Sequence, residues 1–236
     1  MSGKSAFVVG YSGECGHQLA KILLSRPIFK RVVFIGRRKL DVDSDPVLKN
    51  MEQAVVDFDK LDDSKEVFSG VDVGFCCLGT TRGKAGKDGF YKVDHDYVTA
   101  TAKAAKEGGV SHFHLISSSG ASSNSFFYYS KVKGQTENDV AALGFNRFSI
   151  YRPAMLLCDR TESRPMERAA MAVIKPVSKL RPTLISVPVE SVAKAMIWSN
   201  FVPAPNPATN SATDREVYEN AKIHEMSAEF DRNFKS

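Results

Sequence analysis

No apolar run in the sequence is long enough to cross a membrane. A membrane-spanning helix needs roughly 18 apolar residues, whereas the apolar runs at residues 7–9 and 32–35 are short. The opening residues MSGKSAFVVG combine a basic residue with a short apolar run, but no small-residue cleavage site precedes the glycines. This pattern favours a strand over a signal peptide, and we expect a chain without a membrane span.

Cysteine is scarce, and the four cysteines form neither a C-x-x-C pair nor a zinc-binding spacing; they are Cys15, Cys76, Cys77 and Cys158. Cys76 and Cys77 are adjacent within an apolar run, which is typical of small buried hydrophobic side chains. We therefore expect all four to be reduced, as in a reducing compartment.

Metal-binding histidine pairs and strong charge are also missing. None of the five histidines has a second ligand at metal-site spacing, and His112 and His114 are expected to pack in the core or at a sheet edge. The net charge of +5 is mild and the basic residues are dispersed. Such a charge permits an anionic ligand but does not indicate nucleic acid. The sequence predicts neither a metal site nor a nucleic-acid interface.

What the sequence does contain is a regular alternation of short apolar runs with helical patterns. The apolar runs predict strands at residues 5–10, 31–36, 53–57, 73–78, 111–117 and 147–151. Helices are predicted between them at residues 14–25, 60–68, 90–107 and 127–143. This alternation predicts an α/β fold built on a doubly wound parallel sheet.

The pattern changes after about residue 152. A basic apolar helix is broken at Pro176, another helix begins near Glu190, and the polar tail carries a possible helix at 214–229. The length suits a single domain. We expect residues 1–236 to form one domain, with 153–236 supplying a small helical cap on the substrate side and the C-terminal tail.

Three glycines, Gly10, Gly13 and Gly16, stand between the first predicted strand and the first predicted helix. Glycines at a strand-to-helix turn let the backbone approach a pyrophosphate, which the helix N-terminus attracts. The spacing G-x-x-G-x-x-G is equally compatible with a plain packing turn. A second run with this spacing, residues 83–89, has no strand immediately before it, and we interpret it as a mobile loop.

Arg37 and Arg38 follow the second predicted strand, about twenty residues after the glycine turn. An acidic residue at this place binds the ribose 2′-hydroxyl of NAD, whereas arginine accommodates the 2′-phosphate of NADP. The arginine pair therefore favours NADP. The alternative is a solvated basic loop.

Two further strand ends are candidates for ligand contact. Asp57 and Phe58 follow the third strand, where they either pack around an adenine or serve as a helix cap and a core residue. The run CCLGTTRG ends the fourth strand at the carboxyl edge, where ligands bind in doubly wound sheets. We expect Leu78, Gly79 and Thr80 along the cofactor, and Arg82 as a possible clamp for phosphate or substrate.

The run LISSSGASSNSFFYYSKVKGQTE carries the pattern most specific to catalysis. Tyr129 and Lys133 are four residues apart and share one face of a predicted helix that follows a strand ending in serines. A lysine ammonium favours the tyrosine phenolate, and such a tyrosine exchanges a proton with a carbonyl or alcohol during hydride transfer. The alternative is an aromatic helix face with a solvated lysine. Tyr218 and Lys222 repeat the spacing, where we expect only an exposed helix.

Taken together, the glycine turn, the serine-ended strand and the tyrosine–lysine pair resemble the short-chain dehydrogenase/reductase superfamily, in its atypical branch. More closely, four runs between residues 5 and 200 resemble the Tat-interactive protein family of oxidoreductase-like proteins: GFCCLGTTRGKAG, IGRRKL, VDFDKLDD and LLCDRTESRP. The resemblance implies a Rossmann domain that binds NADPH.

The resemblance also implies particular site residues. The implied proton donor is Tyr129, with Lys133 as its pKa tuner and Ser118, chosen over Ser119, holding the substrate oxygen. With Gly10 and Gly16 for the turn, the implied cofactor-binding residues are Ser12, Gly13, Glu14, Cys15, Arg37, Arg38, Leu78, Gly79, Tyr129, Lys133, Leu156 and Arg164. The helix at 90–107 contains no asparagine, which many dehydrogenases of the superfamily use in a proton relay.

The expected function is NADPH-dependent hydride transfer to or from a carbonyl or alcohol. The alternative is a non-catalytic NADPH-binding regulator, because the family is associated with apoptosis, tumour suppression, transcription and nuclear import through importins. Members can carry an extension before the first strand, which we do not expect here. The resemblance implies a cytoplasmic protein, with the nucleus or nuclear envelope as a further location.

Overall fold

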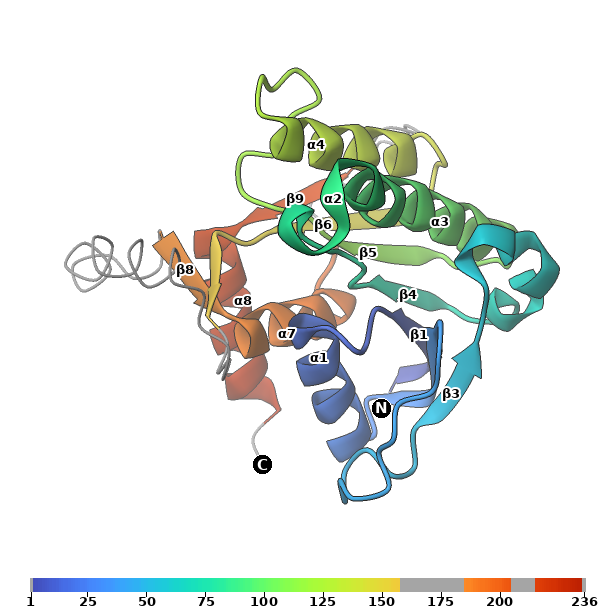
Figure 1. Ribbon diagram of the computed structural model, residues 1–236. Helices are drawn as coiled ribbons and strands as arrows, with labels where there is room; N and C mark the ends of the chain where they lie inside the picture. The colour runs from blue at the N-terminus through green and yellow to red at the C-terminus, as the bar shows by residue number, and fades with distance from the viewer. Residues whose placement is uncertain (1, 158–184, 205–214, 235–236) are drawn as a thin grey trace.

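A seven-stranded sheet forms the centre of the molecule (Figure 1). The computed structural model describes residues 2–157, 185–204 and 215–234. The strand order is β3-β2-β1-β4-β5-β6-β9, and every neighbouring pair is parallel. The chain adds strands on one side of β1 and then continues from β4 on the other side. This is the doubly wound arrangement, so the predicted fold class is confirmed.

The predicted strands all form, and the described residues contain three more. The sheet consists of β1 (Ser2–Val9), β2 (Phe29–Gly36), β3 (Glu52–Val55), β4 (Val73–Cys76), β5 (His112–Ile116), β6 (Arg147–Arg152) and β9 (Glu216–Glu219). A separate two-stranded sheet pairs β7 (Met155–Leu157) with β8 (Ser186–Pro188). Strand β4 is buried along its whole length, as expected for a strand covered on both faces.

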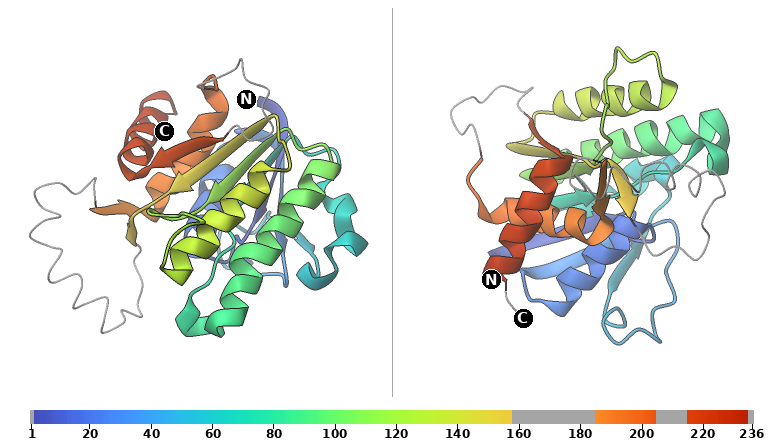
Figure 2. Two further views of the ribbon diagram at one scale, coloured as in Figure 1. Left: turned by 90° about the horizontal axis from the view of Figure 1, so that it is seen from above. Right: turned by 90° about the vertical axis from the view of Figure 1, so that its left-hand side faces the viewer.

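Helices cover both faces of the sheet, as the views in Figures 1 and 2 show. One face carries α1 (Glu14–Ser25), α7 (Val189–Trp198) and α8 (Asn220–Asn233), with the short 3₁₀ turn η3 (Ser199–Phe201) after α7. The other carries the 3₁₀ segment η1 (Phe58–Phe68), α3 (Tyr97–Glu107) and α4 (Tyr128–Ala141). Successive side chains of a strand point to opposite faces, so each layer of helices covers its own hydrophobic core.

The glycine run at residues 83–89 is helical, and its interpretation as a mobile loop is wrong. It lies in α2 (Arg82–Tyr91), which Gly86, at φ +71°, divides, and which continues through the π-helix η2 (Lys92–Asp96) into α3. Phe90 at the end of α2 is fully buried, with its ring centroid 5.4 Å from that of Tyr129. This tertiary contact stabilises a helix that the local sequence disfavours.

The C-terminal region contributes to the sheet as well as to its covering. Tyr218 lies in β9 and is buried, so the expectation of an exposed helix there is wrong for this residue; α8 begins only at Asn220. Helix α7 packs against α1 and α8. The predicted helix around Pro176 lies outside the described residues. No helix within residues 2–157, 185–204 and 215–234 combines the length and apolarity needed to cross a bilayer.

Candidate cofactor and active site

A pocket of about 570 Å³ opens beyond the carboxyl ends of β1, β2 and β4. Strand order reverses between β1 and β4, where ligands bind in doubly wound sheets. Seven of the predicted site residues line it: Gly10, Ser12, Gly13, Arg37, Arg38, Leu78 and Gly79. The residues after β1, β2 and β4 therefore line one pocket.

The turn after β1 requires glycine at two positions. Gly10 has φ +77°, and a Cβ there would lie 2.5 Å from the backbone carbon of Cys77. A Cβ at Gly16 would lie 2.3 Å from the carbonyl oxygen of Gly10. Both clashes are with backbone atoms, so neither position accepts a side chain without moving the turn. The turn thus brings β1, α1 and the end of β4 into close contact.

The geometry of this turn fits a dinucleotide. Ser12 and Gly13 line the pocket directly before α1, where the positive end of the helix dipole attracts a phosphate. At the other end, Thr81 has a buried hydroxyl with no hydrogen-bond partner among the described residues, next to the pocket-lining Thr80. A buried polar group without a partner is uncommon, and a polar ligand bound nearby is one way to satisfy it. The pocket therefore offers a region that attracts an anion, before α1, and a polar region near Thr80.

The two candidate arginines lie at the β2 side of the pocket. Arg37 and Arg38 line it directly after Gly36, and both are exposed. Phe58, from the next crossover, lines the same pocket but is largely buried and contacts the ring of Tyr97 at 5.3 Å. Asp57 accepts a hydrogen bond from the Asp59 backbone at the start of η1, which is the capping role considered for it.

A buried ion pair lies behind the pocket wall at Gly79. The ammonium Nζ of Lys133 lies 2.6 Å from Asp94 Oδ1, and Asp94 Oδ2 accepts a hydrogen bond from the Thr80 backbone at 2.7 Å. A Cβ at Gly79 would be 3.4 Å from Asp94 and 3.9 Å from the lysine nitrogen. Burial by itself lowers the pKa of Lys133, but the Asp94 carboxylate and the nearby Tyr129 together raise that pKa above its ordinary value.

Helix α4 presents Tyr129, Lys133 and Glu137 on one face. Tyr129 is 40% exposed, whereas Lys133 and Glu137 are buried. Glu137 binds Arg152 through two hydrogen bonds, at 3.0 and 2.6 Å, and accepts a third from Ser117 Oγ at 2.5 Å. These contacts fix α4 against the ends of β5 and β6, so the first half of the helix is held over the carboxyl edge of the sheet.

The three serines after β5 differ in their surroundings. Ser117 is buried and its hydroxyl is used by Glu137, as described above. Ser118 is half-buried and Ser119 is exposed. Only Ser118 and Ser119 therefore have hydroxyls accessible to a substrate, which narrows the choice to the same two residues that the sequence left open.

Several other predicted residues do not line this pocket. Glu14 is exposed, Cys15 in the first turn of α1 is buried in the core, and Leu156 packs against that core. Arg82 stacks on Tyr128, with 5.6 Å between the guanidinium carbon and the ring centre, instead of facing the pocket. Arg164 lies outside the described residues.

Sequence reasoning missed pocket and site residues that only the fold assembles. Tyr11, Gly36, Cys77, Val93 and Tyr97 also line the pocket. Cys76 is fully buried as expected, but Cys77 is half-buried at the pocket wall. Asp94 was not considered, because it lies in a different helix from its partner Lys133. The one sequence signal for Asp94 is its position in the predicted helix at residues 90–107, where related dehydrogenases carry an asparagine.

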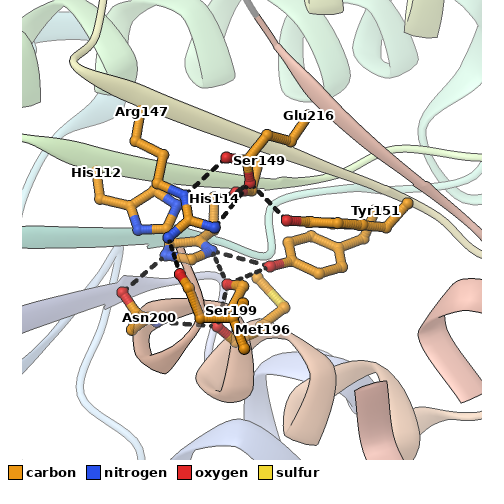
Figure 3. Close-up of polar contacts among 11 residues, drawn as sticks. His112, His114, Arg147, Ser149, Tyr151, Met196, Ser199, Asn200 and Glu216 are labelled. Atoms are coloured by element: carbon orange, nitrogen blue, oxygen red, sulfur yellow. Dashed lines mark hydrogen bonds and ion pairs between the residues drawn. The ribbon is translucent and has the colours of Figure 1, made fainter. Parts of the chain in front are cut away.

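A second polar cluster is buried between β5, β6, β9 and the end of α7 (Figure 3), and it shares no residue with the lining of the pocket. His112 Nε2 lies 2.8 Å from Ser149 Oγ, which donates to Glu216, and His114 Nδ1 lies 3.1 Å from the Tyr151 hydroxyl. Both histidines are buried, so their predicted core packing is confirmed. Burial lowers the pKa of each well below its ordinary value.

The fold and the pocket together define a nicotinamide-dinucleotide-binding protein of the Rossmann type. Comparison with known proteins agrees: residues 10–198 match the family model described as NAD(P)H-binding. Protein HTATIP2 of Rattus norvegicus is 49% identical over 84% of this chain and 81% of its own length. The chain belongs to this NAD(P)H-binding family and, within it, to the HTATIP2-like atypical short-chain dehydrogenase/reductases.

Further comparisons extend this result. A short-chain type dehydrogenase/reductase from Mycobacterium ulcerans shares the fold, with a TM-score of 0.64 at 15% identity over 93% of this chain and 90% of the other. Protein FMP52-1, mitochondrial, of Scheffersomyces stipitis is 34% identical over 91% of this chain and 97% of its own length. Other yeast relatives are also named mitochondrial FMP52 proteins, and these names contradict the predicted cytoplasmic or nuclear location.

Proposed function

We propose that the chain is an NADPH-dependent oxidoreductase that acts on a carbonyl or an alcohol. The observation that carries the proposal is the arrangement of Tyr129 and Lys133 on one helix face, with Lys133 next to the nucleotide pocket at Gly79. A charged lysine near the accessible tyrosine favours the phenolate and so eases proton transfer.

The cofactor would lie along the carboxyl edge of the sheet. Ser12 and Gly13 would hold its diphosphate, Arg37 and Arg38 its 2′-phosphate, and Leu78 and Gly79 the part nearer Lys133. When bound, the nicotinamide supplies or accepts the hydride. Tyr129 would give or take the proton at the substrate oxygen, and Ser118 would hold that oxygen by a hydrogen bond.

Cofactor selection is tested by titrating NADPH and NADH against the protein and its Arg37→Ala/Arg38→Ala variant. Hydrogen bonds to a charged group contribute about 1.5–3 kcal/mol, so the variant should bind NADPH roughly ten-fold or more weakly. NADH binding should change little, because NADH has no 2′-phosphate. Equal affinity of the unaltered protein for both nucleotides would contradict the assignment of the arginines.

Turnover is tested with a panel of carbonyl compounds and the Tyr129→Phe variant. Removing a general acid typically lowers the rate about 10²–10⁴-fold, and NADPH affinity should stay within a small factor because the ring is retained. Tyr128→Phe, the neighbouring tyrosine on the same helix, is the matched control and should retain activity. Equal rates for Tyr129→Phe and the unaltered protein would show that Tyr129 is not the acid.

A second candidate is a non-catalytic NADPH-binding regulator. The observation that favours it is that Tyr129, which is 40% exposed, does not line the nucleotide pocket and stacks on Phe90. In that case no compound in the panel is reduced, although NADPH still binds. The same titration and panel therefore distinguish the two candidates.

For the location we propose the mitochondrion, on the names of the FMP52 relatives. Cell fractionation with antibodies against this chain should recover it with mitochondrial markers. Recovery with cytosolic or nuclear markers instead would reject the proposal.

A further inference from the structure

The side chain of Tyr11 lies beneath the loop that carries the two arginines. Its backbone belongs to the glycine turn, between Gly10 and Ser12, yet the residue is only 2% exposed. A Cβ at Gly36 would lie 2.9 Å from the Tyr11 ring, so the absence of a side chain at Gly36 makes room for that ring. The ring also contacts Phe34 edge to face, at 5.8 Å between centroids. The side chain of Tyr11 thus reaches from the glycine turn to the end of β2.

The hydroxyl of Tyr11 meets two acceptors at the arginine loop. It lies 3.1 Å from the Arg38 carbonyl oxygen and 2.9 Å from Gln53 Oε1. Gln53, in β3, then binds the same loop two residues further on: its Oε1 accepts from Leu40 N at 2.8 Å, and its Nε2 donates to Leu40 O at 3.1 Å. The loop backbone is therefore bound at Arg38 and at Leu40.

The arginine side chains themselves have no comparable support. Arg37 and Arg38 are exposed, and neither makes an ion pair with another residue of the described part of the chain. Arginine side chains are long and flexible, so the place where their guanidinium groups can meet a phosphate depends on the position of the loop backbone. A loop held in one position lets these side chains bind a charge without first paying for ordering the backbone.

We propose that Tyr11 and Gln53 are positioning residues that set the selectivity for a nucleotide with a 2′-phosphate. Both residues act through the loop that carries Arg37 and Arg38. Tyr11 connects this loop to the glycine turn, and Gln53 connects the loop to β3. The inference rests on the proposed function, in which Arg37 and Arg38 bind the 2′-phosphate. It adds that the selectivity of the arginines depends on two uncharged side chains beneath them.

The test compares dissociation constants for NADPH and NADH in four proteins: the unaltered chain, Tyr11→Phe, Gln53→Leu and Ser149→Ala. A net hydrogen bond is worth about 0.5–1.5 kcal/mol, so Tyr11→Phe should weaken NADPH binding roughly 2–10-fold and Gln53→Leu somewhat more. NADH binding should change less than about two-fold, because it does not use the arginines. The same comparison is repeated with adenosine 2′,5′-bisphosphate in place of NADPH and AMP in place of NADH, which removes the nicotinamide half of each ligand.

Ser149→Ala is the control for a general loss of stability. It removes a buried hydroxyl from the cluster of Figure 3, away from the pocket, and should lower the melting temperature without changing the ratio of the two constants. If Gln53→Leu does not fold, Tyr11→Phe, which keeps the ring, decides the question. An unchanged ratio in Tyr11→Phe overturns this inference and leaves the proposed function intact, provided that the unaltered protein prefers NADPH. Equal affinities in the unaltered protein overturn both.

Discussion

At the scale of single residues, Asp94 is the group whose role the fold reveals. Its carboxylate is 1% exposed and contacts the Lys133 ammonium at 2.6 Å, while it also accepts from the Thr80 backbone. It lies in the π-helical segment η2, within the helical region where the sequence analysis found no asparagine. An acidic residue there holds the lysine by charge, where an amide would offer a hydrogen bond only.

Asp94→Asn should therefore lower the free energy of unfolding. The substitution preserves size but leaves the buried Lys133 ammonium without its counter-charge, and breaking a buried pair typically costs about 3–5 kcal/mol. Urea denaturation at pH 7 measures the loss. The pKa of Lys133 should also fall, because burial is then less opposed, and a pH profile of activity would report the change.

Asp96→Asn, two residues along, provides the matched control for this carboxylate. Asp96 is exposed and faces His95 at the surface, and surface substitutions usually change stability by no more than about 0.5 kcal/mol. If Asp94→Asn is as stable as Asp96→Asn, the ion pair contributes nothing and its role is disproved.

At the scale of elements, the β1–α1 turn joins a strand to a helix and also contacts the end of β4. Because Gly16 packs on the Gly10 carbonyl and Gly10 on the Cys77 backbone, a change at either residue displaces the end of two strands. Tightness of this turn therefore affects both the stability of the sheet and the shape of the pocket.

Gly16→Ala tests this tightness. The added Cβ would meet backbone only 2.3 Å away, and such overpacking costs about 3 kcal/mol. Thermal denaturation should show a lower melting temperature, and NADPH should no longer raise it appreciably, because the turn is displaced.

Gly83→Ala in α2 supplies the comparison. No atom lies within 4 Å of a Cβ built there, and alanine favours a helix by about 1 kcal/mol over glycine. Its melting temperature should stay the same or rise, and NADPH should still stabilise it. A similar fall in melting temperature in Gly16→Ala and Gly83→Ala would contradict the close packing of this turn.

At the scale of the whole molecule, the buried cluster of His112 and His114 makes stability depend on pH (Figure 3). The two imidazole centroids are 3.8 Å apart. Burial lowers the pKa of both, and neighbouring Arg147 lowers it further. The folded state therefore keeps them neutral where the unfolded chain is already protonated.

The sign of the effect follows from linkage. Above pH of about 6.5, the ordinary histidine pKa, both states are neutral and these groups do not change stability with pH. As the pH falls below that value, the unfolded chain binds protons first, so stability should fall by up to about 1.4 kcal/mol per pH unit for each histidine. Urea denaturation at pH 8, 7, 6 and 5 measures this.

The interval from pH 6.5 to 5 isolates the histidines, because carboxylates titrate near pH 4. Stability should be nearly constant between pH 8 and 7 as far as these groups are concerned, and should decline between pH 6.5 and 5. Constant stability down to pH 5 would show that the two imidazoles accept protons without unfolding.

Local sequence signals were sufficient to predict most helices and strands and the residues that line the nucleotide pocket after β1 and β2. The bounds predicted for α1 are those observed, and the arginines and glycines do share a pocket. These features depend on short-range patterns: apolar runs, glycine at a strand end, and residues directly after parallel strands. The prediction of a loop at residues 83–89 was wrong, because the helix there is stabilised by the burial of Phe90 against α4, which lies far along the chain.

The sequence by itself determined the doubly wound sheet, the turn after β1 and the tyrosine–lysine spacing, because each depends on residues close together in the chain. Only the tertiary structure decided which distant residues support them. Asp94 meets Lys133, Gln53 meets Tyr11, and Glu216 of β9 meets Arg147 of the neighbouring strand β6. The physical reason is that a buried charge or polar group needs a partner in space, and no spacing along the chain indicates where that partner lies.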